Sequence, residues 1–457
     1  MAGIQLYSGD KMAKSHVAAL VLALVATGAM AQQQPAMQWE TAALAGSYKE
    51  NISEDEKIAG LSKLWSEVKY NFVDTATLEK LDWDKLYLET LPRVRAARST
   101  EEYYRVLMEL VARLKDGHTN VMPPAELSDR LGGQPLLVTR PVEGRVIVTE
   151  VLDPGLRAKG IMPGLEVVAV DGAEVKAYAA REIAPYVSAS TPQDEALRTF
   201  GTQFLRGAVG SAARVTFRDA AGKQFEQQVA RVGREARKAA TVNSPSFEFS
   251  MLPGDVAYVS LNSFDDNSAA DAWLAAFDEI AKSSALVIDI RRNGGGNSDV
   301  GYKILSTLDD KAFLTSRWAT RDYKPTWRAW DKAQPMYAEA PDAVQPDPQR
   351  QYKKPVLVLT SAATFSAAED FAVAFDVMQR GTLVGEATGG STGQPLLVKL
   401  PGGGSARICT KQDTYPDGRA FVGVGVQPQH LVKQTVEGVR AGRDEVLEAA
   451  LASLQPK

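Results

Sequence analysis

The sequence predicts a multidomain α/β protein, because its residue pattern changes twice along 457 residues. Apolar residues recur at helical spacing between 39 and 114, and short β-rich runs separated by turns fill 133–231. Strands then alternate with helical runs from 256 to 454, which favours a core with parallel strands. With 45% hydrophobic residues, the chain has apolar material for about two or three domains.

Residues 1–31 have the pattern of an export signal. Basic Lys11 and Lys14 precede an apolar stretch from 17 to 25, and a small-residue cleavage pattern, Ala-Met-Ala, ends at Ala31. The apolar stretch is shorter than the roughly 20 residues of a membrane-spanning helix. We therefore expect a periplasmic or secreted protein with no stable membrane span. Met12 is an alternative start of translation.

Residues 38–125 are predicted to form a helical N-terminal domain. Ser99, followed by acidic Glu101 and Glu102, is typical of a helix start. Two apolar runs show helical spacing, Ile58, Leu61, Leu64, Trp65 and Val68 and then Tyr104, Leu107, Leu110, Val111 and Leu114.

Residues 130–232 are predicted to form a β domain. The segment 151–172, with turns at Asp153-Pro154-Gly155 and Asp171-Gly172, resembles a PDZ domain. PDZ domains add an extended peptide to a sheet edge and bind its terminal carboxylate with backbone amides. Residues 133–138 are the candidate carboxylate loop and strand, and 181–210 is an insertion without an evident role. A purely structural β domain is the alternative.

Ser366 lies at the start of a predicted helix, after an apolar strand at 356–359 and a turn of small residues. The first N–H groups of a helix have no partner within it, so a negative charge that forms there meets donors and a favourable dipole. This position suits a nucleophile. The alternative is that Ser366 or Thr364 is an ordinary N-cap, which is the commoner role of a serine before a helix.

A second motif runs from Asp289 to Gly296, where the apolar strand at 285–290 continues into three consecutive glycines. Glycines leave backbone amides open to a substrate, so the strip suits an oxyanion hole. Taken alone, three glycines are equally typical of a turn. Together with the serine turn, they indicate a hydrolytic site.

These two motifs resemble the Asp-x-Arg-x-Asn-x-Gly-Gly segment and the Ser-Ala-x-Glu turn of the C-terminal processing and tricorn peptidases. The helical, PDZ-like and core segments follow in the order of that family, so the resemblance covers nearly all of the mature chain. It implies a crotonase-like core of ββα units at 245–457. It also implies an exported serine endopeptidase with Ser366 as nucleophile and the amides of Gly295 and Ala367 as oxyanion donors.

The family divides by its general base. The processing peptidases have a lysine 25 residues after the nucleophile, and that position here is Ser391. The tricorn-like branch uses a histidine after the N-terminal region, and the segment 114–119 resembles that motif, which implies His118 as the base. An imidazole has a pKa suited to accepting a serine proton. We expect His430 to be structural.

A third group should orient the imidazole. Tricorn-like relatives use a late glutamate, but the segment here that resembles it, 421–429, contains no carboxylate. Gln427 can accept a hydrogen bond but carries no negative charge. We expect Glu369 or Asp116 to take this place.

Three functions stay open at this point. The leading one is an exported serine peptidase that acts on polypeptides, including through their C-termini. The second is a catalytically silent PDZ-containing peptide-binding protein, suggested by the missing lysine and the missing late glutamate. The third is a non-peptidase hydrolase or acyl enzyme on the same core, which export and the PDZ-like segment disfavour.

Composition restricts partners and cofactors. The net charge is −4 with both signs spread along the chain, so nucleic acid is not an expected partner. We find no metal-ligand cluster and no phosphate loop, and expect no cofactor. Cys409 is the only cysteine, which excludes an intramolecular disulfide.

Overall fold

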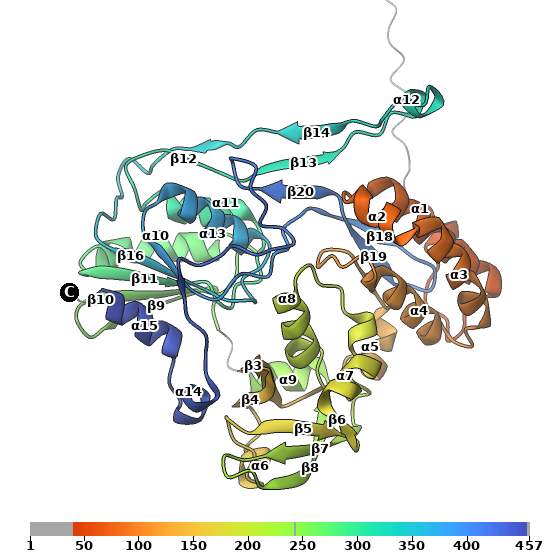
Figure 1. Cartoon of the computed structure of the whole chain (residues 1–457), viewed down its shortest axis with the longest axis horizontal. Coiled ribbons are helices and arrows are strands. Elements are labelled where there is room, and N and C mark those ends of the chain that lie inside the picture. Colours follow the sequence, from red (N-terminus) through yellow and green to blue (C-terminus); the bar gives the residue numbers. More distant parts are fainter. Residues whose placement is uncertain (1–39, 242–243, 455–457) are drawn as a thin grey trace, which may run out of the picture. The chain divides into compact units, whose positions relative to one another are not determined.

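The computed structural model describes residues 40–241 and 244–454, and the predicted signal peptide lies outside these ranges. The fold is mixed, with helices first, then a largely β region, then strands alternating with helices (Figure 1). Within the described ranges, no helix is both long enough and apolar enough to span a membrane.

The helical region has four main helices. Ser53 and Ser99 begin the first and last of them, each with its hydroxyl accepting from a backbone N–H three residues on. Their apolar faces bury Leu61, Leu64 and Leu107 in one cluster. The helices are α1 (Glu54–Asn71), α2 (Thr75–Leu81), α3 (Trp83–Ala96) and α4 (Thr100–Ala112), and short turns are η1 (Ala42–Leu44), η2 (Ala125–Leu127) and α5 (Ser128–Leu131).

The β region is built on one antiparallel sheet in the order β2-β8-β7-β5-β4-β3, with β6 on β5. Its edge strand β3 is covered by η4, because the Thr139 hydroxyl donates to the carbonyl of Phe200 at 2.6 Å. The strands are β2 (Gln134–Pro135), β3 (Leu137–Val142), β4 (Arg145–Val151), β5 (Glu166–Val170), β6 (Ala173–Glu174), β7 (Ala212–Arg218) and β8 (Gln224–Val232). The helices are α6 (Pro154–Ala158), α7 (Val175–Glu182), η3 (Ala184–Tyr186), α8 (Pro192–Leu197), η4 (Arg198–Thr202) and α9 (Arg234–Ala240).

The core contains a six-stranded sheet in the order β21-β17-β16-β11-β10-β9, parallel except for the edge strand β9. It is buried on both faces, because Leu286 and Ile288 pack with α10, α11 and α13, while Val287 packs with α15. Such strands appear in the sequence as unbroken apolar runs. The strands are β9 (Phe247–Leu252), β10 (Val256–Leu261), β11 (Ala285–Asp289), β16 (Val356–Thr360), β17 (Thr382–Gly385) and β21 (His430–Leu431). The helices are α10 (Ser268–Ile280), α11 (Ser298–Leu305), α13 (Ala367–Met378), α14 (Val436–Ala441) and α15 (Glu445–Ser453).

Between the core strands β11 and β16, the chain forms a hairpin with a short helix at its tip. Arg321 of the hairpin donates to the carbonyl of Lys69 at 2.6 Å, and Tyr323 packs edge-on against Tyr70, so the hairpin reaches α1. The elements are β12 (Phe313–Leu314), β13 (Arg317–Arg321), α12 (Pro325–Ala329), β14 (Met336–Glu339), β15 (Ala343–Val344) and β20 (Lys411–Thr414). The sheet order is β14-β13-β20, and β12 pairs with β15.

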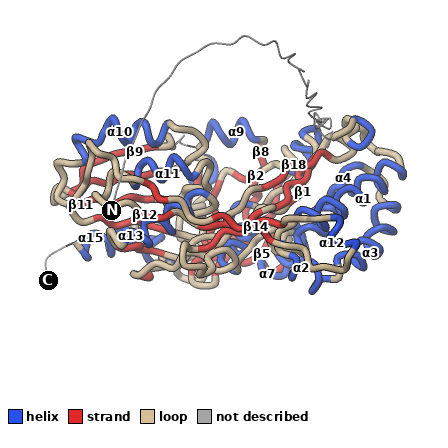
Figure 2. The backbone as a smooth tube through the Cα atoms, turned by 90° about the horizontal axis from the view of Figure 1, so that it is seen from above, coloured by secondary structure: helices blue, strands red, loops and turns tan. Residues whose placement is uncertain are grey.

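Another sheet, β1-β19-β18, joins the first and last parts of the chain. Its strands are β1 (Asn120–Met122), β19 (Ser405–Cys409) and β18 (Pro395–Lys399). Figure 2 shows β1 and β18 beside the helices α1 and α4. Val398 and Ile408 from the late strands are buried in the apolar cluster of these helices. The helical region therefore shares its core with a hairpin from the far end of the sequence.

Candidate active site

The nucleophile turn connects β16 to α13, as the sequence predicts. Ser366 is the N-cap residue of α13 and has φ 57° and ψ −129°. A positive φ is unfavourable for a residue with a side chain, by about 1–3 kcal/mol, and such strain often occurs at functional positions. The backbone N–H of Ser366 donates to the carbonyl of Ser391 at 3.1 Å, which holds this conformation.

The glycine strip lies directly against this turn. Gly295 has φ 99°, and a Cβ built on it would lie 2.6 Å from Cβ of Ser366 and 2.9 Å from the nitrogen of Ala367. No side chain fits there. In the described residues, the N–H of Ala367 has no hydrogen-bond partner, whereas the N–H of Gly295 donates to Oδ1 of Asn293 at 2.9 Å.

Three hydrogen bonds tie the two motifs together. Oγ of Ser361 donates to the carbonyl of Arg291 at 2.7 Å, and Oγ1 of Thr364 donates to that of Ile290 at 2.9 Å. The N–H of Phe365 donates to the carbonyl of Asn293 at 3.1 Å. Thr364, the alternative N-cap of the sequence analysis, therefore fixes the turn to the glycine strip instead.

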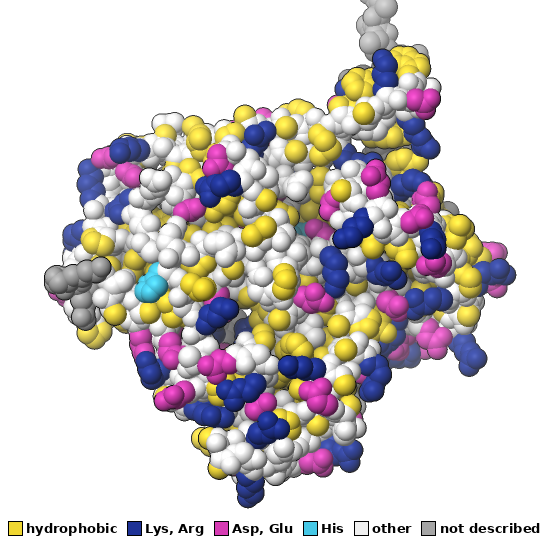
Figure 3. All heavy atoms as spheres, in the orientation of Figure 1, with side chains coloured by type: hydrophobic (Ala, Val, Ile, Leu, Met, Phe, Trp, Pro, Cys, Tyr) yellow, Lys and Arg dark blue, Asp and Glu magenta, His cyan; other side chains and the backbone are white. Residues whose placement is uncertain are grey.

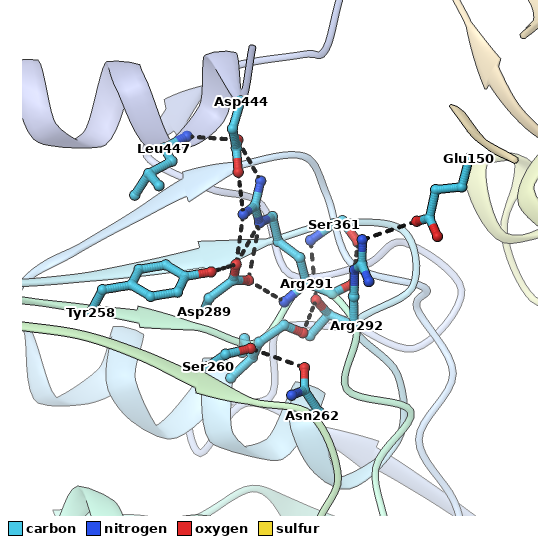
Figure 4. Close-up of polar contacts among 12 residues, drawn as sticks. Glu150, Tyr258, Ser260, Asn262, Asp289, Arg291, Arg292, Ser361, Asp444 and Leu447 are labelled. Atoms are coloured by element: carbon cyan, nitrogen blue, oxygen red, sulfur yellow. Dashed lines mark hydrogen bonds and ion pairs between the residues drawn. The ribbon is translucent and has the colours of Figure 1, made fainter. Parts of the chain in front are cut away.

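Arg291 anchors the glycine strip to the C-terminal helix. Its guanidinium lies between the carboxylates of Asp289 and Asp444, with nitrogen–oxygen distances of 2.6–3.1 Å and 2.7–2.8 Å (Figure 4). The pKa of Arg291 is raised, since these ion pairs outweigh its burial. Arg292 points the other way and pairs with Glu150 of β4 at 3.1 Å. The strip is thus held from both sides.

His118 lies next to the nucleophile. Its Nε2 is 3.1 Å from Oγ of Ser366, and its Nδ1 is 2.8 Å from Oγ of Ser391. The ring is buried and stacks on Phe365, with centroids 4.8 Å apart and an angle of 13°. Position 391 stood out in the sequence only because the lysine of the processing peptidases is missing there. The serine at this position is the residue whose hydroxyl contacts Nδ1 of His118.

The surroundings of His118 favour the neutral imidazole. Burial lowers the pKa of His118 to about 3, and the positive charges of Arg407, Arg198 and Lys411 act in the same direction. A neutral ring can accept a proton on Nε2, but the imidazolium that results is not favoured in this environment.

Glu369 is linked to the imidazole only through Ser391. It is fully buried, and its carboxylate accepts from the N–H of Gly390 at 2.6 Å, the N–H of Ser391 at 2.7 Å and the hydroxyl of Thr388 at 2.5 Å. Burial raises the pKa of Glu369 to about 7. The carboxylate thus holds the loop that carries Ser391.

Asp116 holds the backbone of the histidine, because its Oδ1 accepts from the N–H of His118 at 3.0 Å. Burial raises the pKa of Asp116. Among the hydrogen bonds of the described residues, none joins Asp116 or Glu369 to the imidazole ring. His430 is exposed on the edge strand β21, and Gln427 bonds to backbone carbonyls nearby.

The segment 188–198, within the insertion that had no evident role, contacts the loops that carry His118 and Ser391. The N–H of Gly117 donates to Oγ of Ser190 at 2.9 Å, and the hydroxyl of Thr191 donates to the carbonyl of Gly389 at 2.8 Å. Nε2 of Gln193 donates to the carbonyls of Thr388 and Val424, both at 2.9 Å. The loops on both sides of His118 are therefore supported from the β region.

A cavity of about 430 Å³ borders the nucleophile turn. It is lined by residues 361–363 of the turn, by the β3–β4 hairpin including Arg140, by α8, and by Glu386 and Lys433. The lining carries both signs of charge. Figure 3 shows the same mixture over the visible face, where acidic and basic side chains alternate without a large patch of one sign.

The sequence matches two family models. Residues 255–432 match Peptidase family S41, and residues 56–112 match the Tricorn protease C1 domain. The first match contains the nucleophile turn and the glycine strip, and the second covers most of helices α1 to α4.

Curated relatives and solved structures agree with these matches. The chain is 25% identical to the chloroplastic C-terminal processing peptidase of Tetradesmus obliquus, over 80% of this chain and 75% of that one. It is 24% identical to the carboxyl-terminal-processing protease of Picosynechococcus sp., over 82% and 83%. Mature CPAF has a similar structure, with a TM-score of 0.68, 16% identity and coverage of 87% of this chain and 96% of that one. A putative peptidase from Parabacteroides merdae gives 0.54, 18%, 89% and 98%. The two solved structures share the fold.

Proposed function

Because its core matches Peptidase family S41, this chain is a serine-type peptidase, and we propose that it cleaves polypeptides with Ser366 as nucleophile and His118 as general base. The observation that carries the proposal is the distance of 3.1 Å between Nε2 of His118 and Oγ of Ser366. It lies within hydrogen-bond reach, as proton transfer requires.

In the proposed mechanism the imidazole proton is on Nδ1, where the oxygen of Ser391 accepts it at 2.8 Å. Nε2 then takes the hydroxyl proton of Ser366 as Oγ bonds to the substrate carbonyl carbon. The tetrahedral intermediate breaks its C–N bond, and Nε2 returns the proton to the leaving nitrogen. Water hydrolyses the acyl-enzyme by the same route and restores Ser366.

The oxyanion of the intermediate requires hydrogen-bond donors, and the N–H groups of Ala367 and Gly295 are the proposed pair. The N–H of Gly295 is bonded to Asn293, so it must exchange that partner for the substrate oxygen. This change of partner is local, because Asn293 and Gly295 are only two residues apart in the chain. Substrate binding would thus complete the oxyanion hole.

The imidazole lacks a carboxylate on Nδ1, and its neighbours Arg407, Arg198 and Lys411 oppose its protonation. A general base with such a low pKa accepts protons poorly. We therefore expect slow turnover by the resting site. This feature also supports the second candidate function, a catalytically silent peptide-binding protein.

Export and peptide binding by the β region are further parts of the proposal. The signal-like pattern at 1–31 supports a periplasmic or secreted enzyme, and fractionation of cells that make the full chain tests it. The β region is proposed to be PDZ-like. Its β3 edge is covered by η4, so a peptide could add to β3 only after η4 moves.

The test of the function is hydrolysis of denatured casein by the wild-type enzyme, beside the Ser366→Ala and His118→Ala variants. His430→Ala is the matched control, because His430 is an exposed histidine on the edge of the core sheet. We expect cleavage and fluorophosphonate labelling in the wild type and the control, and loss of both in Ser366→Ala. A folded wild type without cleavage and without labelling would support the silent alternative.

A further inference from the structure

The sheet β1-β19-β18 leads directly into the candidate active site. His118 stands two residues before β1, and Ser391 stands four residues before β18. The central strand β19 runs antiparallel to both neighbours, so its C-terminal end lies with the starts of β1 and β18. His118 and Ser391 therefore precede strands that start at the same end of the sheet, where β19 ends.

One face of this sheet is buried and the other is open. Val121, Val398, Ala406 and Ile408 share the face that packs into the helical cluster. The opposite face carries Asn120, Met122, Leu397, Lys399, Ser405 and Arg407, in which Arg407 pairs with both Asn120 and Leu397. Leu397 is 57% exposed and Met122 is 37% exposed, so this face is accessible to a substrate.

Arg407 has no direct ion-pair partner. Within the described residues its guanidinium makes no hydrogen bond and no ion pair, although it is half-buried. Burial lowers its pKa and the charge of Arg198 lowers it further, while the charge of Asp116 acts in the opposite direction. A partly desolvated cation without a partner is unfavourable, and binding an anion would relieve that cost.

Arg198 belongs to the same positive region. It is held by Asp194 at 2.6 Å, and its guanidinium lies 5.0 Å from the centre of the Phe365 ring, which stacks on His118. Arg407 pairs with Asn120, two residues after His118, and Arg198 lies over the ring that stacks on His118, so both charges lie near the imidazole. Arg198 comes from the β region and Arg407 from the sheet β1-β19-β18.

We propose that Arg407, assisted by Arg198, binds a carboxylate of the polypeptide substrate close to the bond that is cleaved. The inference deepens the proposed peptidase function and rests on it. Guanidinium groups bind carboxylates with two parallel hydrogen bonds, which gives both affinity and orientation. Leu397, directly beside Arg407, and Met122, further along the open face, would contact an apolar substrate side chain. The carboxylate belongs either to an Asp or Glu side chain or to the C-terminus of the substrate.

A bound carboxylate would also change the base. Its single negative charge would offset part of the positive charge that opposes the imidazolium, so the pKa of His118 would rise from its low value. Substrates with the carboxylate would then be cleaved faster as well as bound more tightly. In kinetic terms, both kcat and KM would improve.

The test uses a bond that the wild-type enzyme cleaves in denatured casein, identified by mass spectrometry. Peptides spanning it carry Glu or Gln at each of the three positions on either side, and end in a free acid or an amide. We expect one such pair to differ by about tenfold or more in kcat/KM, the effect of one charge-assisted contact. A Glu and Gln difference identifies a side chain, and an acid and amide difference identifies the C-terminus.

The variants then assign the effect to Arg407. In Arg407→Gln the preference should fall to about twofold or less, whereas Arg407→Lys should retain part of it. Lys399→Gln is the matched control, because Lys399 is an exposed cation on the same open face, at the end away from His118. The control should keep the full preference.

Two outcomes would overturn the inference. The first is a wild type that cleaves casein but treats every matched pair within about twofold. The second is an Arg407→Gln variant that keeps the wild-type preference. A wild type without any cleavage would instead contradict the proposed function, so the two failures are distinguishable. The comparison of peptides on the wild type needs no variant to fold.

Discussion

The nucleophile turn and the surroundings of the imidazole ring are built in different ways. Ser366, Ala367 and Gly295 lie in two short motifs that are joined to each other by hydrogen bonds. His118, by contrast, is positioned by contacts with several other segments, including Ser391, which lies 273 residues along the chain. The first half of the site is a rigid arrangement of two directly bonded motifs, and the second half depends on how several distant parts of the chain pack. Substitutions should therefore act sharply in the first half and more gradually in the second.

The largest effect is expected at Gly295, in the rigid half. Gly295→Ala would place a methyl group 2.6 Å from Cβ of Ser366 at a φ of 99°. We expect kcat/KM on a casein-derived peptide to fall by at least about 100-fold, as for loss of an oxyanion donor. Gly294→Ala is the control, since nothing lies within 4 Å of a Cβ there. Activity of Gly295→Ala within threefold of the control would contradict the rigid arrangement.

Ser391→Ala tests the second half. It removes the hydroxyl that lies 2.8 Å from Nδ1 of His118 and that accepts the Nδ1 proton in the proposed mechanism, so the ring would lose the partner that fixes its tautomer and orientation. We expect kcat to fall by about 10–100-fold with a smaller change in KM, because Ser391 acts through the general base. Glu369→Gln should have a smaller effect in the same direction, since Glu369 acts on the backbone of Ser391. Unchanged kcat in Ser391→Ala would show that the ring needs no partner on Nδ1.

Ser190→Ala tests the support from the β region. Its hydroxyl accepts from the N–H of Gly117, next to His118. One such hydrogen bond contributes about 1 kcal/mol, so we expect a loss in kcat/KM of about fivefold or less. The melting temperature distinguishes a local effect from general destabilisation. A loss as large as that of Ser391→Ala would mean that the β region controls the base more strongly than this contact suggests.

The smallest effect is expected from pH. Because burial and neighbouring cations lower the pKa of His118 to about 3, the ring of the free enzyme stays neutral far below its usual titration range. The plot of kcat/KM against pH reports the free enzyme. It should change by less than about threefold between pH 4.5 and pH 6, where Glu369, whose pKa burial raises to about 7, is already mostly protonated, while the fold is intact by circular dichroism. A fall of about tenfold or more over this window, as an imidazole of ordinary pKa would give, would contradict this environment.

The same contrast explains what the sequence could and could not predict. The strand, turn and helix around Ser366 follow from local patterns, so the elements and the candidate nucleophile were predictable from the residues themselves. His118 followed from a resemblance, and its distance from Ser366 agrees with the role assigned to it. Domain boundaries, the PDZ-like assignment and the catalytic roles stay predictions.

Other features could not be predicted from the sequence, because they are contacts between residues far apart in the chain. The bond between His118 and Ser391 joins positions 273 residues apart, and no local pattern marks it. The contacts of Ser190, Thr191 and Gln193 with the catalytic loops are also long-range, which is why their segment had no evident role. The strands β13 and β14 were not predicted, and they form by pairing with each other and, for β13, with β20. Tertiary pairing decided the structure of this segment.

The sheet β1-β19-β18 joins strands that the ribosome makes at very different times. A ribosome makes β1 early, but its partner β19 appears only when most of the chain has been made, because Asn120 pairs with Arg407. Until then the segment carrying His118 has no strand to fix it beside the nucleophile turn. We therefore expect a nascent or truncated chain that lacks β19 not to hold His118 beside Ser366, so the candidate catalytic pair would form late in synthesis.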